Sequence, residues 1–233
     1  MAKKLVVIPT YNEVENIQAM VPELMGLYKD QIDILVVDDN SPDGTAAEVE
    51  RLQKEHPEVH LLNRPGKQGL GKAYLAGFAW GLERDYSAII EMDADFSHRP
   101  VDLKKLLEAI DENPFVVGSR YIPGGSTVNW GVIRKIISRG GSLYTRFILG
   151  YPLNDWTGGF NAWTRSTLEA IKLDQVFSEG YCFQIELKYR AMKAKLAGKE
   201  VPITFEDRRV GQSKMSFRIV LEALYRVWFL KFI

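Results

Sequence analysis

The sequence predicts an α/β protein in which helices cover both faces of a single, doubly wound and mostly parallel sheet. Two observations support this fold class. Short apolar segments rich in Val and Ile alternate with longer amphipathic segments in the first half of the chain, as they do in repeated strand–helix–strand units. No stretch of linker-like composition divides the 233 residues. We therefore expect one main domain.

The predicted strands are continuous apolar runs. Strands of a parallel sheet that helices cover on both sides have no solvent-facing side, so they lack the alternation of a half-exposed strand. Five segments have this pattern, KLVVIP (4–9), IDILVVDD (32–39), VHLLN (59–63), SAIIEMD (87–93) and FVVGS (115–119). A sixth segment, KEVPITFED (199–207), is also strand-like.

Segments of helical length lie between these strands. One begins after Asn12, a second has Ser41 as its predicted N-cap with Pro42 in the first turn, and a third follows a Gly-rich turn. An amphipathic helix is expected at about 132–149, and a last one at the end of the chain. We predict a main domain over residues 1–215 and an amphipathic helical appendage over residues 216–233.

Composition limits the partners and the compartment. Lys plus Arg equals Asp plus Glu, at 30 each, so nothing attracts the whole chain to nucleic acid and no such partner is predicted. A single cysteine, Cys182, excludes an internal disulfide and fits a reducing compartment. The first residues lack the apolar run of a signal peptide, and no window of 18 apolar, uncharged residues encodes a membrane-spanning helix. The expected location is cytoplasmic.

Acidic residues follow three of the predicted strands. Glu13 follows the first strand, Asp38 and Asp39 end the second, and Asp93 and Asp95 end the fourth. Ligands of open α/β sheets bind at the carboxyl ends of the strands. Any one of these acids could simply end a strand or cap a helix, but their convergence on one edge indicates a bound cation.

The Asp93-Ala94-Asp95 segment predicts the kind of cation. Two carboxylates offer hard oxygen ligands and leave most coordination positions open, which suits Mg²⁺ or Mn²⁺ shared with substrate phosphates. The expected ligand is therefore a phosphorylated molecule. A zinc site is excluded because the three histidines have no suitable spacing; they are His56, His60 and His98.

Three cationic features could meet phosphate. NRPGKQGLGKAY (63–74) resembles a phosphate-binding loop but matches neither the P-loop nor the dinucleotide fingerprint. Arg120 directly follows a buried strand, so it meets either an anion or the acidic rim in a structural ion pair. Arg208, Arg209 and Lys214 lie in a Gly-containing loop that is either a lid over phosphate or a solvated charge cluster.

Taken together, the motifs resemble those of dolichol- and polyprenol-phosphate mannose synthases. The segments are VIPTYNE, VVDDNSPDGT, MDADFSH, VGSRYIPGG and VPITFEDRRVGQSKMS, and the resemblance covers about residues 4–216. PTYNE and the Asp-X-Asp segment occur in many inverting glycosyltransferases, whereas the other segments are more specific. AYLAGFAWGL and GYCFQIEL are most similar to bacterial polyprenyl-monophosphomannose synthases. The resemblance implies the glycosyltransferase A fold, which is Rossmann-like and binds nucleotide sugars, with residues 1–215 as the catalytic domain.

The resemblance also implies roles for individual residues. The guanosine part of GDP-mannose would contact five residues, Pro9, Tyr11, Glu13, Val37 and Asp39. Metal and diphosphate would contact Asp93, Ala94 and Asp95, and Ser97, where some relatives have Gln, would be a third metal contact.

Basic residues would meet the phosphates of donor or acceptor, namely Arg120, Arg208 and Lys214, and the acceptor would also contact Arg134 and Ser138. The residues expected to carry catalysis are Asp95, Arg120, Arg208 and Lys214.

The implied reaction is metal-dependent transfer of mannose from GDP-mannose to a polyprenyl or dolichyl phosphate, with inversion. The helices at 132–149 and 216–233 pair basic with apolar residues, so they either lie on a membrane surface or complete the core. We expect a peripheral protein on the cytoplasmic face of a membrane and leave open a separate membrane-spanning partner. The alternatives are UDP-glucose or another nucleotide sugar as donor, a sugar hydroxyl as acceptor with Asp155 as base, and a non-catalytic nucleotide-sugar-binding protein.

Overall fold

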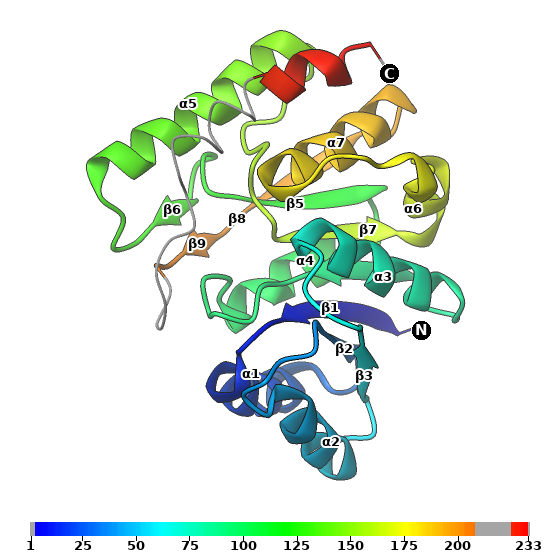
Figure 1. The fold of residues 1–233 in the computed structure, drawn as a ribbon. Helices are drawn as coiled ribbons and strands as arrows, with labels where there is room; N and C mark the ends of the chain where they lie inside the picture. Colours follow the sequence, from blue (N-terminus) through cyan, green and yellow to red (C-terminus); the bar gives the residue numbers. More distant parts are fainter. Residues whose placement is uncertain (1–2, 208–224, 233) are drawn as a thin grey trace.

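The computed structural model describes residues 3–207 and 225–232. Its main feature is a seven-stranded sheet in the order β3-β2-β1-β4-β7-β5-β8, with helices on both faces (Figure 1). The strands are β1 (Lys4–Thr10), β2 (Ile32–Asp38), β3 (Val59–Asn63), β4 (Ala88–Glu91), β5 (Phe115–Ser119), β7 (Asn161–Thr164) and β8 (Gly198–Pro202). All neighbouring strands pair in parallel except β7, which is antiparallel to β4 and to β5. The predicted α/β class and mostly parallel sheet are confirmed.

The helices connect the strands in the predicted alternation. They are α1 (Val14–Tyr28), α2 (Thr45–Glu55), α3 (Leu70–Leu82), α4 (Leu103–Ala109), α5 (Val132–Leu149), α6 (Arg165–Ala170) and α7 (Gly180–Lys193), with 3₁₀ turns η1 (Pro100–Asp102) and η2 (Leu173–Gln175). Residues 225–230 are also helical. The predicted bounds of α5 are confirmed. The boundary predicted at residues 215 and 216 lies outside the described residues.

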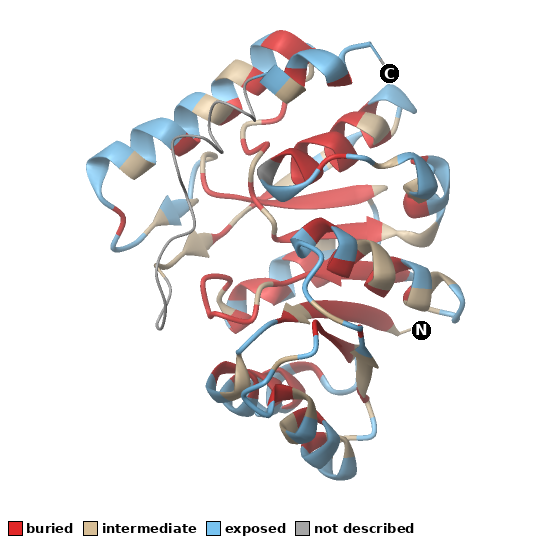
Figure 2. Cartoon of the chain, viewed as in Figure 1, coloured by how far each residue is buried: buried red, intermediate tan, exposed pale blue. Residues whose placement is uncertain are grey.

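The core consists of two apolar layers, one on each side of the sheet. Alternate residues of β1 point to opposite layers, because successive side chains of a strand face opposite ways. Val6 and Ile8 belong to the layer that α1 and α4 cover, whereas Leu5 and Val7 belong to the layer that α3 and α7 cover. The strands are buried along most of their length (Figure 2). This burial explains the continuous apolar runs in the sequence.

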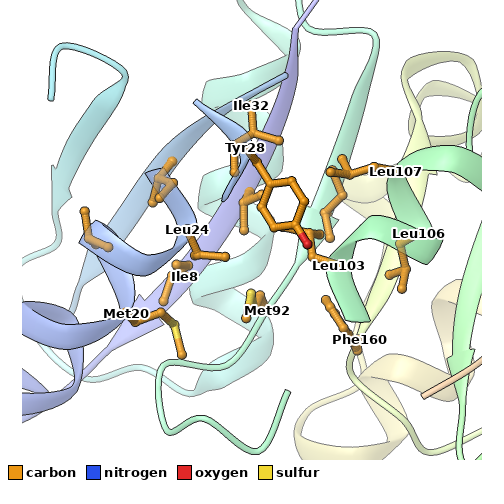
Figure 3. Packing of buried hydrophobic residues seen from close by; sticks show 14 of the residues in the cluster. Ile8, Met20, Leu24, Tyr28, Ile32, Met92, Leu103, Leu106, Leu107 and Phe160 are labelled. Carbon is orange, nitrogen blue, oxygen red and sulfur yellow. The ribbon is translucent and has the colours of Figure 1, made fainter. Parts of the chain in front are cut away.

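The layer under α1 and α4 fixes how these helices sit on the sheet. Figure 3 shows the Tyr28 ring among Leu24, Leu103 and Leu107, with Phe160 nearby. The buried Tyr28 hydroxyl donates to the Pro100 carbonyl at 3.1 Å, so its polar atom is satisfied. This bond ties the end of α1 to the 3₁₀ turn that follows the Asp-X-Asp loop.

On the other face, α3 packs unusually close to β1 at Gly77. A Cβ atom at this position would lie 2.4 Å from Cγ1 of Val7. Only glycine fits such an approach. The close contact brings the face of α3 that carries Tyr74 toward the end of β4.

Two predicted details are wrong. Ser41 does not cap α2, which begins at Thr45 with Gly44 as N-cap in a left-handed conformation. Instead, the Ser41 hydroxyl and amide donate to the Asp38 carboxylate at 2.6 and 2.8 Å. A carboxylate is the stronger acceptor, so it holds Ser41 in the turn after β2.

The second wrong detail is the continuous strand predicted at 199–207. It is divided between β8, which joins the main sheet, and β9 (Thr204–Phe205), which pairs with β6 (Ser126–Thr127) in a separate two-stranded sheet. The small sheet lies near the start of α5 (Figure 1).

Helix α5 has its polar and apolar faces reversed relative to an ordinary surface helix. Three small polar residues on it are buried, Ser138, Ser142 and Thr145. Its exposed side carries large apolar residues, Val132, Ile133, Ile136, Leu143 and Phe147, the last with 84% of its surface accessible. Figure 2 shows this exposed side along the length of the helix. Of the two interpretations of this helix, completion of the core is therefore wrong for its apolar stripe.

The end of the chain packs beside α5 (Figure 1). Val227 and Leu230 are buried in the same apolar layer as Ile148 and Leu149 of α5. The other side of this segment exposes four aromatic residues, Tyr225, Trp228, Phe229 and Phe232. The two segments therefore share a core and add their exposed apolar side chains to one region.

Candidate active site

The carboxyl ends of β1 and β2 lie side by side and carry most of the residues predicted to hold the nucleoside. Pro9 is the register partner of Val37. Tyr11 follows β1, and its ring is 37% exposed, with the Lys67 ammonium 4.2 Å from the ring centroid. The Glu13 carboxylate accepts a bond from Asn16 at 2.7 Å. The structure thus brings Pro9, Tyr11 and Val37 to one sheet edge.

The two acids that end β2 have different surroundings. Asp38 is fully buried and accepts from the Thr10 hydroxyl at 2.8 Å as well as from Ser41. It holds the turn and does not face a ligand. Asp39 accepts from Nη1 of Arg64 at 2.7 Å. Burial raises the pKa of Asp39, although Arg64 opposes the shift.

Arg64 is a site residue that the sequence did not reveal. Its side chain is 8% exposed, and its Nη2 donates to Gln68 at 3.1 Å. It therefore anchors the Gly-rich segment after β3 to the end of β2. The only local signal is a basic residue directly after a predicted strand.

The Asp-X-Asp loop follows β4 and is held by its neighbours. Tyr74 of α3 donates to Oδ1 of Asp93 at 2.9 Å. The Asp93 amide donates to Nδ1 of His98 at 3.0 Å, and Oδ1 of Asp95 accepts from the Ser97 amide at 3.1 Å. Burial lowers the pKa of His98, which favours the neutral ring that can accept this bond. The residue between, Phe96, has a φ of 60°, which turns the loop sharply.

The donor atoms of this loop fit a hard divalent cation. Among the described residues no group of three or more His, Cys, Asp or Glu side chains could hold a metal ion by itself. The loop supplies the carboxylates of Asp93 and Asp95. Oγ of Ser97 is buried with no hydrogen-bond partner among the residues described here. Two carboxylates and a hydroxyl leave several positions for water and substrate phosphate, as Mg²⁺ and Mn²⁺ require.

Arg120 forms a buried ion pair with Asp155. Its Nε and Nη2 donate to the two carboxylate oxygens at 2.7 Å each, and its backbone amide donates to Oδ2 at 3.0 Å. Burial alone would raise the pKa of Asp155, but the Arg120 charge and hydrogen bonds outweigh it and lower the pKa. Asp155 is therefore an ionised structural partner and a poor general base. Arg120 therefore has an ion-pair partner, Asp155, that is not one of the rim acids, and its contact with phosphate stays a prediction.

A second set of buried polar residues, not found from the sequence, supports this pair. The fully buried Lys188 donates to the carbonyls of Trp156 at 3.1 Å and Gly158 at 2.7 Å. Glu91, at the end of β4, accepts from Asn161 at 2.8 Å and Gln184 at 3.0 Å. Burial raises the pKa of Glu91 and lowers that of Lys188. These contacts fix the loop that carries Asp155 and the strand that precedes Asp93.

The residues predicted to contact the acceptor lie at the start of α5. Nη1 of Arg134 donates to Asp207 at 2.8 Å, and Ser138 accepts from the Tyr121 hydroxyl at 2.6 Å. The Arg134 and Arg120 guanidinium carbons lie 4.0 and 5.5 Å from the centroid of the Trp130 ring. The structure therefore brings Arg120, Arg134 and Ser138 into one neighbourhood. Arg208 and Lys214 lie outside the described residues.

Strand β9 connects this neighbourhood to the Asp-X-Asp loop. The Phe205 ring lies 5.4 Å from the His98 ring and 5.3 Å from the Trp130 ring, edge-on to both. The Glu206 amide donates to the Ser97 carbonyl at 3.2 Å. The Asp-X-Asp loop and the start of α5 are thus joined through β9.

A doubly wound, mostly parallel sheet with an Asp-X-Asp loop after β4 defines a glycosyltransferase of the A fold. Solved structures agree with this fold. The glucosyl-3-phosphoglycerate synthase of Mycobacterium tuberculosis with Mg²⁺ and UDP matches with a TM-score of 0.71 and 19% identity, over 98% of this chain and 80% of that one. Its complex with Mn²⁺, UDP and glucosyl-3-phosphoglycerate gives 0.67 and 17%, over 98% and 77%. At 17–19% identity, these matches support the fold alone.

The chain belongs to glycosyl transferase family 2, whose model matches residues 5–172. It is 49% identical over 226 residues to the undecaprenyl-phosphate mannosyltransferase of Micrococcus luteus, covering 96% of this chain and 91% of that protein. It is 48% identical over 227 residues to the polyprenol monophosphomannose synthase of Mycolicibacterium smegmatis, covering 97% and 85%. The predicted resemblance to polyprenol-phosphate mannose synthases is confirmed.

Proposed function

We propose that the protein transfers mannose from GDP-mannose to a polyprenyl phosphate and releases polyprenyl β-mannosyl phosphate and GDP. The observation that carries this proposal is the 49% identity, over 96% of the chain, to an undecaprenyl-phosphate mannosyltransferase. Similarity of this extent spans both the nucleoside side of the site and the region around α5.

On the donor side, the residues at the ends of β1 and β2 hold the nucleoside. Asp93 and Asp95, with Ser97, would hold Mg²⁺ or Mn²⁺. When bound, such an ion neutralises the charge that develops on the departing diphosphate. Tyr74 and His98 keep the loop in position before the substrate arrives, because both bond to Asp93.

On the acceptor side, the chemistry needs no general base. A phosphate monoester has a second pKa of about 6, so its oxygen is already largely anionic at neutral pH. This oxygen attacks the anomeric carbon while the bond to the GDP oxygen breaks, and the configuration inverts. A sugar hydroxyl would need a basic carboxylate, and the candidate for that role, Asp155, is fully buried and paired with Arg120. The geometry therefore favours the phosphate acceptor.

The lipid acceptor gives α5 a role. In the described part of the chain no helix combines the length and apolarity needed to cross a bilayer. The exposed stripe of Ile133, Ile136, Leu143 and Phe147 instead suits a helix lying in the interface, and α5 carries four basic residues and no acidic one. We place this surface on the cytoplasmic face of an anionic membrane, where it would meet the acceptor headgroup.

The test is transfer of radiolabelled mannose from GDP-mannose to a short polyprenyl phosphate, with Mg²⁺ or Mn²⁺ against EDTA. We expect metal-dependent, butanol-extractable label and a loss of at least about a hundredfold in Asp95→Asn, since one metal ligand is removed. Asp111→Asn is the matched control, because that carboxylate is 56% exposed and pairs with Lys4 on the surface.

Three results would contradict parts of the proposal. Transfer only from a UDP-sugar would change the donor, transfer only to a sugar hydroxyl would change the acceptor, and retention of configuration would exclude direct displacement. Tight nucleotide binding without transfer to any acceptor would favour the non-catalytic alternative.

A further inference from the structure

Trp130, the residue two positions before α5, has an indole N–H that no described residue accepts. The side chain is 7% exposed, and its Nε1 atom is buried with no hydrogen-bond acceptor in the part of the chain that the structure describes. The Nε atom of Arg134 is also buried with no hydrogen-bond acceptor among the described residues. The guanidinium carbon of Arg134 lies 4.0 Å from the centroid of the Trp130 ring. Nearly all buried donors in proteins are paired, because an unpaired one is costly. Two neighbouring exceptions indicate a shared acceptor supplied by a ligand.

The charges around Trp130 specify what kind of acceptor this is. The guanidinium carbons of Arg134 and Arg120 lie 4.0 and 5.5 Å from the centroid of the Trp130 ring, and each guanidinium also pairs with a carboxylate, Asp207 and Asp155 respectively. Helix α5 begins at Val132, and its N-cap residue Gly131 makes no side-chain cap hydrogen bond. The donors still to be satisfied are the helix N-terminus, the indole N–H and Nε of Arg134, and together they favour an anion with several oxygens. A phosphate has this chemistry.

We infer that the Trp130 indole N–H donates a hydrogen bond to the phosphate of the lipid acceptor, beside Nε of Arg134. This inference rests on the proposed function. The acceptor is the better match than the donor, because Trp130 adjoins the helix with the exposed apolar stripe, whereas the nucleoside residues lie at β1 and β2. Both nitrogen atoms are buried, so neighbouring atoms must move aside when the phosphate binds.

Trp156 shows that an unpaired indole alone does not define such a site. Its Nε1 is also buried without a partner. It lies, however, in the apolar layer with Leu153 and Phe183, and no guanidinium of the described residues lies over its ring. Trp156 therefore provides a matched control in the same protein.

The test is the Trp130→Phe variant, which keeps a ring and deletes the N–H. We expect the acceptor KM to rise about tenfold to a hundredfold, as for a lost bond to a charged group, with donor KM and kcat unchanged. Trp156→Phe should keep the acceptor KM. A rise in donor KM instead, an unchanged acceptor KM, or equal effects in both variants would overturn the inference. A wild-type protein that transfers nothing would contradict the proposed function and not this assignment.

A second measurement does not depend on turnover. In ¹⁵N-tryptophan-labelled wild-type protein, the indole signal absent from Trp130→Phe identifies Trp130. Adding a short polyprenyl phosphate should shift this proton downfield, whereas the corresponding alcohol without phosphate should not. An unshifted signal at saturating phosphate, or the same shift with the alcohol, would overturn the inference.

Discussion

Asp155 and Arg120 form an ion pair that is almost completely removed from water, with side chains 0% and 5% exposed. Removing one partner of such a pair leaves an uncompensated buried charge, which is strongly destabilising. The pair is nevertheless placed beside the rings of Trp130 and Phe205. The Arg120 guanidinium is therefore fixed in position beside these two rings.

Asp155→Asn should lower the free energy of unfolding by about 3–5 kcal/mol at pH 7. The folded protein holds the pKa of Asp155 below its ordinary value, so its stabilisation is present above the unfolded pKa of about 4 and is lost as pH falls through the folded value. The difference between wild type and variant in urea unfolding should thus stay constant from pH 7 to 5 and shrink below pH 4.

The pair of Asp111 and Lys4 is the control, because the Asp111 side chain is 56% exposed. Asp111→Asn should cost less than about 1 kcal/mol at pH 7. A difference for Asp155→Asn that persists undiminished at pH 3 would contradict the assignment of its charge.

The sequence revealed site residues only where a short pattern carried them. Asp93 and Asp95 were found because two acids follow an apolar run. The buried contacts of Arg64 with Asp39 and of Lys188 with Gly158 could not be predicted from a local pattern, because they join residues that are 25 and 30 positions apart. Lys188 also lies in a segment where apolar and polar residues alternate, Phe183 to Arg190, and this pattern does not indicate a buried lysine.

At the level of secondary-structure elements, α5 differs from an ordinary helix because most of its large apolar side chains are exposed and small polar side chains are buried. Its fold-directed side is built from Ser138, Ser142 and Thr145, and its solvent-directed side from large apolar residues. Helical periodicity also places the exposed Lys135 and Arg139 beside the apolar stripe. The helix can therefore offer apolar and cationic contacts to one surface without weakening the core.

Replacing Ile133, Ile136 and Phe147 together by Ser should weaken binding to vesicles of anionic and neutral phospholipid by at least about tenfold, since each apolar side chain contributes up to about 1.5–3 kcal/mol when buried. Sedimentation of vesicles measures this. Transfer to a water-soluble acceptor and the far-UV circular dichroism should not change.

The control for surface apolarity is Leu27→Ser with Leu70→Ser, two exposed residues on α1 and α3. We expect no loss of vesicle binding from this pair. An equal loss of vesicle binding in both variants, or no loss in either, would contradict the prediction that α5 contacts the membrane.

Elements were predictable in proportion to their length and burial. The bounds of β3, β5 and α5 followed from their apolar patterns. The two residues of β6 carry no pattern, and the sequence predicts β8 and β9 as one strand because VPITF has three large apolar residues and no charge. The antiparallel direction of β7 depends on which strands it joins, and Asn161–Thr164 does not encode that choice.

For the molecule as a whole, the net charge is zero, so binding of polyanions must depend on local groups. The proposed site extends across the sheet edge from β2 to α5, so different elements would hold the two substrates. Binding of nucleotide with metal should therefore stabilise the entire domain and be measurable by global unfolding.

GDP with Mg²⁺ or Mn²⁺, each at a hundred times its dissociation constant, should stabilise the protein by about 2.7 kcal/mol, which corresponds to a rise in Tm of roughly 5–10 °C for a domain of this size. Differential scanning fluorimetry measures the shift. Asp95→Asn should lose the metal-dependent part. A larger shift with UDP than with GDP would contradict the choice of donor.

The position of β7 has a consequence for synthesis on the ribosome. Asn161 of β7 bonds to Glu91 of β4 across 70 residues, and β7 lies between β4 and β5. A nascent chain that ends after β5 can pair β3, β2, β1 and β4, but the outer edge of β4 remains open. Open edges invite pairing with other chains. The Asp-X-Asp loop therefore gains its final support late in translation, and truncated products should be prone to aggregation.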